Sequence, residues 1–180
     1  MNNAENLVDT DHFVFVSQAT EDDIDQYTTG ECHVFAVALH RRFGWPMMAV
    51  LDYGEPYWEN PEDSEDFIPA VCHVFAIDPD GHAWDVMGVR KREDVREEVE
   101  SWCSISDYVA EYLSVEDELA PYVGAWGEDE EGNLIDRPLH AFTEKDVEEA
   151  TEKAFRIFAG HPVFEEGVGA MRKPGTPRPS

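Results

Sequence analysis

The tetrapeptide DPDG at residues 78–81 constrains the fold more than any other feature, because it predicts a turn and the register of the strands around it. Proline presets the first central backbone angle, and Gly81 supplies the left-handed position of a three-residue hairpin loop. The flanking apolar segments, 71–77 and 82–89, are then expected to pair as antiparallel strands.

This register places two polar side chains together. Position 75 pairs with position 85, and position 73 pairs with position 87. Side chains two residues apart share a face of a strand. His73 and Asp85 are therefore predicted to be diagonal neighbours on one face, at a separation that long side chains can bridge. A loop with an even number of residues would turn Asp85 to the other face.

The strongest helix signal precedes this hairpin. Thr28 and Glu31 have the spacing of a capping box, and Gly44 followed by Pro46 marks the end. Between these limits the apolar residues recur with helical spacing. They are Cys32, Phe35, Ala36, Leu39 and Phe43.

Cys32 therefore falls in the first turn of a helix, where free N–H groups and the helix dipole favour a thiolate. His73 can take its proton, and Asp85 can orient the imidazole. Each residue alone has a structural interpretation, such as a buried cysteine or a hydrogen-bonded histidine. The three together favour a functional site. Gln26 is either an ordinary surface residue or a donor to a developing oxyanion.

Four short segments of this region resemble the core of the transglutaminase-like proteins within the papain-like cysteine protease superfamily. The segments are GECHVFA at 30–36, GWP at 44–46, HVF at 73–75 and WD at 84–85, and the resemblance covers residues 26–90. In that family a cysteine opens a helix, a histidine lies on a following strand, and an aspartate lies on the next strand.

The resemblance implies a role for each candidate. Cys32 would be the nucleophile, His73 the general base and Asp85 the orienting acid. Gln26 has the spacing to the nucleophile that is found in papain-type peptidases, where a glutamine lines the oxyanion hole.

Charge limits the partners of the chain. Its 180 residues include 40 acidic and 13 basic side chains, for a net charge of −27. Such a field repels nucleic acid and anionic lipid heads, so neither nucleic acid nor a membrane is an expected partner. We expect a protein or peptide substrate. A solvated acidic surface explains the charge better than mimicry of DNA, because the acidic residues are scattered along the sequence; a basic protein partner is the alternative.

The chain is expected to form a single catalytic-type domain, residues 1–166, followed by a disordered Gly/Pro-rich tail, residues 167–180. Three cysteines suggest reduced thiols rather than a disulfide framework. The start of the chain lacks signal-peptide features, which predicts a cytoplasmic protein. Residues 54–69 are interpreted as an acidic loop and 121–142 as a loop or weak hairpin. Further helices are expected at 93–102, 106–114 and 143–159.

No cofactor or metal is expected. Two Cys-His dipeptides, 32–33 and 72–73, suggest zinc, but adjacent residues on a strand point to opposite faces and cannot easily share one ion. Cys72 is expected to pack on the helix or on the far face of the sheet. We expect the remaining histidines near these motifs on the surface. They are His33, His40 and His82.

The sequence therefore predicts an α+β, papain-like/transglutaminase-like fold. A nucleophile-bearing helix packs on an antiparallel sheet that includes 47–53, 71–77 and 82–89, and the C-terminal half is helical. The leading function is a cysteine-dependent hydrolase or acyltransferase that acts on a peptide or carboxamide carbonyl through a thioester. The alternative is a non-enzymatic acidic binding or inhibitor protein on the same fold that engages a basic partner.

Overall fold

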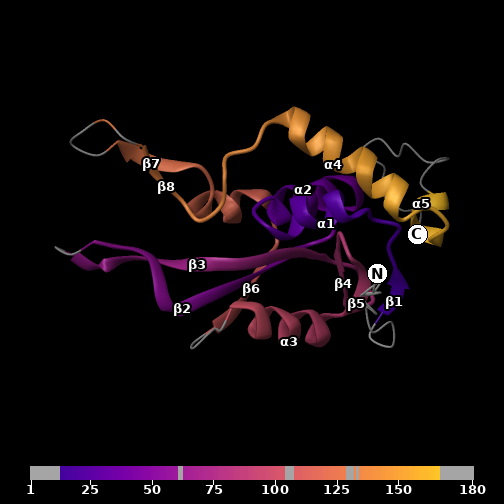
Figure 1. The fold of residues 1–180 in the computed structure, drawn as a ribbon, viewed down its shortest axis with the longest axis horizontal. Coiled ribbons are helices and arrows are strands. Elements are labelled where there is room, and N and C mark those ends of the chain that lie inside the picture. The colour runs from indigo at the N-terminus through magenta and orange to yellow at the C-terminus, as the bar shows by residue number, and fades with distance from the viewer. Residues whose placement is uncertain (1–12, 61–62, 104–107, 129–131, 133, 167–180) are drawn as a thin grey trace, which may run out of the picture.

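The computed structural model describes residues 13–60, 63–103, 108–128, 132 and 134–166. They form an α+β structure around a six-stranded antiparallel sheet of order β1-β5-β4-β3-β2-β6 (Figure 1). The strands are β1 Phe13–Val16, β2 Met47–Asn60, β3 Asp63–Ile77, β4 His82–Asp85, β5 Gly88–Lys91 and β6 Tyr108–Leu113. The predicted disordered tail lies outside the described residues.

The remaining elements are helices and one small hairpin. The helices are α1 Glu21–Thr28, α2 Cys32–Phe43, α3 Arg92–Cys103, the 3-10 helix η2 Glu116–Tyr122, α4 Glu144–Ile157 and α5 Pro162–Glu166. The hairpin pairs β7 Ala125–Glu128 with β8 Leu134–Asp136. No helix in the described part of the chain is long and apolar enough to cross a membrane.

The predicted helix at Cys32 is confirmed, and it is the central element of the structure. It lies between the sheet and α4, with α1 beside it, while α3 covers the opposite face of the sheet (Figure 1). It ends at Gly44, which has a φ of 71°. The sequence predicts that one face of this helix is buried. In the structure every residue from Cys32 to Leu39 is buried, so the helix is covered on all faces along this stretch.

The predicted capping box of this helix is wrong. Thr28 is the last residue of α1, a helix missing from the sequence prediction, and its hydroxyl donates to the carbonyl of Ile24. Glu31 is the N-cap of α2 and makes no side-chain capping bond. A capping side chain would occupy the backbone N–H groups of the first turn. The N–H of Val34 donates to the carbonyl of Glu31 at 3.0 Å, so the first-turn N–H groups that can stabilise negative charge here are those of Cys32 and His33.

The hairpin register is confirmed. Ile77 pairs with Ala83 and Ala76 pairs with Trp84, as a three-residue loop requires. The Asp78 carboxylate accepts the backbone N–H groups of positions 80 and 82, each at 2.9 Å, and so fixes the turn.

The expected strand 82–89 is instead two strands. β4 ends at Asp85, a two-residue turn follows, and β5 begins at Gly88, opposite Asp85. The second Asp85 oxygen, Oδ1, accepts the N–H of Met87 at 2.9 Å. The apolar residues continue through the turn as they would in one continuous strand, so the sequence pattern does not indicate a turn there. Its marker is Gly88, whose φ of +150° is rarely adopted by other residues.

The expected acidic loop at 54–69 is also wrong. β2 and β3 continue through most of it as paired strands that project beyond the rest of the structure, and residues 61–62 lie outside the described part (Figure 1). Register shifts interrupt this pairing at several points. Antiparallel pairing of the two backbones defines this extension.

The C-terminal half is mixed rather than helical. The predicted helix at 106–114 is the edge strand β6, which pairs with β2 along its whole length. Val109 and Tyr112 are exposed, so they do not form the buried face of a helix, and such β-branched and aromatic residues favour strands. The helices predicted at 93–102 and 143–159 are confirmed as α3 and α4.

We predict that Gly88→Ala destabilises the protein by about 3 kcal/mol, because a left-handed alanine is strained and its Cβ would clash. That Cβ would lie 2.3 Å from the carbonyl oxygen of Phe15. Gly81→Ala is the matched control: its φ is +87° with nothing within 4 Å, so strain alone should cost about 1 kcal/mol. Urea denaturation measures both, and equal losses would contradict the steric explanation.

Candidate active site

Three side chains from three elements meet at the N-terminus of α2. Cys32 is its first residue, His73 lies on β3 and Asp85 ends β4. Nε2 of His73 lies 3.1 Å from Oδ2 of Asp85. The residues are 6%, 2% and 4% exposed, respectively, so the site is largely dehydrated.

The end of the β3–β4 ladder makes this meeting possible. Strand alternation groups His73 with Phe75, which packs on the α3 face, whereas Cys32 belongs to the core on the α2 face. The ladder has its last pair at Ala76 and Trp84. Beyond it the His73–Asp85 hydrogen bond joins the two strands, and interaction with the His73 imidazole lowers the pKa of the Cys32 thiol.

The site favours a thiolate–imidazolium pair. Burial raises the pKa of the Cys32 thiol, but interactions with the imidazoles of His33 and His73 outweigh it and lower the pKa well below the ordinary value. Burial lowers the pKa of His73, but Asp85 and Cys32 outweigh it and raise the pKa. Because the Nε2–H donates to Asp85, Nδ1 is the ring nitrogen left for the thiol.

Arg90 on β5 is a fourth member that sequence reasoning missed. Its buried guanidinium donates to Asp85 and to Glu98 of α3, and stacks over the ring of Phe13 with 5.0 Å to the centroid. Burial raises the pKa of Asp85, but the charge of Arg90, followed by the hydrogen bond from His73, lowers it overall. The register of β4 and β5 could have indicated this position. Arg90 pairs with Ala83, and Ala83 lies on the same face of β4 as Asp85.

Gln26 lies on α1, and both ends of its amide have partners. Its Nε2 donates to Glu31, and its Oε1 accepts from Lys153 of α4. The amide thus ties α1 to the N-cap of α2 and to α4. Its role at an oxyanion hole remains a prediction.

His33 does not lie on the surface as expected, since it is fully buried. Its Nε2 lies 3.0 Å from the carbonyl oxygen of His140, and its ring packs edge-on against Phe142 at 5.4 Å. Its Nδ1 makes no hydrogen bond of good geometry within the described part of the chain. Helical periodicity alone could not show this, because the segment that covers His33 comes from far along the sequence.

Cys72 packs against the cluster beneath α3, which is one of the two expected positions. It lies at a register shift of β3, between the pairs Val50–His73 and Leu51–Val71, so the alternation of faces is interrupted between Cys72 and His73. Among the described residues, one trio brings potential metal-ligand atoms within 4.8 Å of one another: Asp78, Asp80 and His82. Asp78 already accepts backbone N–H groups and the indole N–H of Trp84, so this trio is explained as the hairpin turn.

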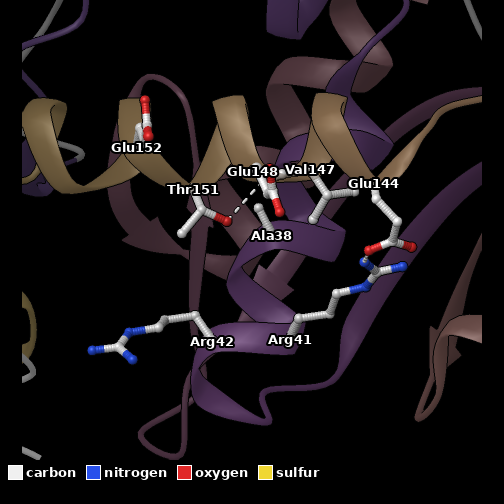
Figure 2. Close-up of a pocket in the computed structure, with 8 residues that line it drawn as sticks. All are labelled: Ala38, Arg41, Arg42, Glu144, Val147, Glu148, Thr151 and Glu152. Atoms are coloured by element: carbon white, nitrogen blue, oxygen red, sulfur yellow. Dashed lines mark hydrogen bonds and ion pairs between the residues drawn. The ribbon is translucent and has the colours of Figure 1, made fainter. Parts of the chain in front are cut away.

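A groove of about 430 Å³ lies between α2 and α4, toward the C-terminal end of α2 (Figure 2). Arg41 on its rim is already bound to Glu144, at 2.7 Å, and to Glu116. The groove contains no cysteine or histidine. Its lining residues are Ala38, Arg41, Arg42, Glu144, Val147, Glu148, Thr151 and Glu152.

Comparisons with models of known families, with characterised proteins and with solved structures each find no match.

We predict that Arg90→Met costs about 3–5 kcal/mol of unfolding free energy, because it leaves the Asp85 carboxylate without its buried cation. The double variant with Asp85→Asn should lose less than the sum of the single losses, because it removes both charges. Arg92→Met, which breaks an exposed pair with Glu93, is the control and should cost under about 1 kcal/mol. Strictly additive losses would show that Arg90 and Asp85 are not coupled.

Proposed function

We propose that this protein is a cysteine-dependent hydrolase or acyltransferase of papain-like/transglutaminase-like type. The observation that carries the proposal is a thiol at a helix N-terminus whose neighbouring imidazole is oriented by a buried carboxylate. This arrangement supplies an activated nucleophile, a proton carrier and the group that fixes the carrier's tautomer.

In the first half-reaction the Cys32 thiolate attacks a peptide or carboxamide carbonyl. The oxyanion accepts hydrogen bonds from N–H groups in the uncapped first turn of α2. The imidazolium of His73 gives its Nδ1 proton to the leaving amine, the C–N bond breaks, and a thioester remains on Cys32. Asp85 stays ionised, held by Arg90, and keeps the His73 ring in place.

In the second half-reaction water or an amine attacks the thioester. Neutral His73 takes the proton of the attacking group, and the C–S bond breaks. The products are a carboxylic acid or a new amide, and the thiolate–imidazolium pair is restored. Gln26 can add an amide donor to the oxyanion if one of its N–H groups turns toward Cys32.

The resemblance at residues 26–90 supports this function. The described fold has the expected order: a helix opened by cysteine, then a strand with histidine, then a strand with aspartate, on one antiparallel sheet. A protein or peptide substrate follows from the same resemblance. Thiols are kept reduced in the cytoplasm, which is consistent with action there.

The alternative is an acidic binding protein that engages a basic partner. Two observations favour it: a net charge of −27, and a nucleophile that is 6% exposed. Under this alternative the buried cluster at Cys32 stabilises the fold and performs no chemistry.

N,N-Dimethylcasein as a generic substrate separates the two functions. Three products are measured: acid-soluble peptides, released ammonia, and incorporation of a fluorescent primary amine. We expect at least one to form, and Cys32→Ser to lower its rate by at least about 1000-fold. Cys72→Ser is the matched control and should retain the rate. Activity that survives in Cys32→Ser would refute the proposal, and no product, together with alkylation of Cys32 no faster than that of Cys72, would favour the binding protein.

A further inference from the structure

Arg90 is a buried cation that two carboxylates share. It is 3% exposed, and its guanidinium lies 5.0 Å from the centre of the Phe13 ring of β1. One arm, Nη2, donates to Oδ2 of Asp85, and the other arm, Nη1, donates to Glu98 of α3. Its third nitrogen, Nε, makes no hydrogen bond within the described residues. In that part of the chain, both hydrogen bonds of the guanidinium therefore go to carboxylates.

The sheet register and the period of α3 together bring Glu98 to this cation. Arg90 pairs with Ala83, which belongs to the cluster beneath α3, so Arg90 lies on the face of the sheet that α3 covers (Figure 1). Val95 and Val99 of α3 are buried in the same cluster. Glu98 follows Val95 by three residues and so lies on the same side of the helix. Its side chain is 30% exposed, which places this carboxylate at the edge of the buried site.

The second carboxylate limits how Arg90 binds Asp85. Oδ2 of Asp85 accepts from Arg90 and also lies 3.1 Å from Nε2 of His73. A guanidinium with both arms free binds a carboxylate bidentately, with one N–H to each oxygen. Such a pair would neutralise Asp85 and compete with His73 for it. Because Glu98 occupies Nη1, only one arm of Arg90 is bound to Asp85.

We propose that Glu98 is a positioning residue of the site, which divides the Arg90 guanidinium between two carboxylates and so leaves Asp85 able to hold the His73 cation. This inference rests on the proposed function and deepens it. The balance of charge supports it. Asp85, Arg90 and Glu98 together carry one net negative charge, which a protonated His73 neutralises. Without Glu98 the pair of Asp85 and Arg90 is neutral, and it favours the imidazolium less.

The other surroundings of His73 carry charge only at a distance or in water. Val50 lies opposite His73 on β2, and the ring of Phe75 lies 6.0 Å from the imidazole. Cys32 of α2 interacts with His73, and Glu31 and His33 flank Cys32 in the sequence. Three exposed charged residues of α3 line a cavity of about 150 Å³ against Phe75, where water screens them: Arg92, Glu93 and Arg96.

A titration of His73 tests the role of Glu98 directly. Glu98→Gln removes the charge but keeps an oxygen that accepts a hydrogen bond from Arg90. Glu97→Gln is the matched control, because it removes the same charge from the exposed neighbouring position of α3. NMR of the full chain labelled with ¹³C-histidine measures the pKa of the imidazole in each protein.

We expect Glu98→Gln to lower the pKa of His73 by about one unit, a tenfold loss of proton affinity, because a nearby anion is removed. Glu97→Gln should change it by less than about 0.3 unit, since water screens an exposed charge. If Glu98 only fills space beside Arg90, the two variants should titrate alike, and that result would overturn the inference.

The labelling of Cys32 by iodoacetamide shows whether the change at His73 reaches the nucleophile. Glu98→Gln should lower the Cys32 rate about tenfold near pH 5.5 and leave it within about twofold of the parent near pH 9.5. The rate of Cys72 should not change at either pH. A Cys32 profile that Glu98→Gln leaves unchanged would contradict the inference. If the parent Cys32 labels no faster than Cys72, the proposed function fails, and the His73 titration still decides the role of Glu98.

A measurement on the unaltered chain does not depend on a variant that folds. ¹⁵N NMR of the arginine side chains reports whether a guanidinium rotates, and nuclear Overhauser effects from the Phe13 ring identify Arg90. We expect separate Nη1 and Nη2 resonances, because bonds to two carboxylates prevent exchange of the arms. A single averaged Nη resonance would show that the guanidinium is not divided between Asp85 and Glu98, and would overturn the inference.

Discussion

The buried carboxylate of Asp85 is the group on which the rest of the site depends. It receives hydrogen bonds from His73, Arg90 and the N–H of Met87, so elements β3, β5 and the β4–β5 turn all converge on it. A carboxylate with so little contact with water persists only if it is paired and hydrogen-bonded. Once it is held ionised, the histidine cation is favoured, and that cation in turn favours the thiolate.

The reactivity assigned to Cys32 arises from neighbours rather than from exposure. Burial alone would keep the thiol protonated, and two imidazoles and the open end of α2 oppose that effect. The first-turn residues Cys32, His33 and Val34 of α2 are buried, so their N–H groups lie in a largely dry environment where a hydrogen bond to an anion is strong. A buried cysteine is also what an inert structural cluster would contain. The reactivity of Cys32 therefore has to be measured to distinguish the two.

The sequence predicted the pairing of His73 with Asp85 correctly, because a three-residue loop at 78–81 leaves one register. It did not reveal Arg90, because the apolar residues alternate through the turn before Gly88, so the pattern does not separate β5 from β4. The edge strand β6 was taken for a helix, since short apolar spacings fit both periods. His33 was placed on the surface because burial by residues 140–142 is a tertiary contact that local pattern does not contain.

The central claim is that Cys32 rests as a thiolate beside a protonated His73. The far-ultraviolet absorbance of the thiolate, followed through an acid titration as the difference between the parent protein and Cys32→Ser, measures this state directly. The account predicts a thiolate signal that is already present at neutral pH and is lost only on acidification, below the ordinary thiol pKa of about 8.5. A signal that appears only as the pH rises through that ordinary value would contradict it.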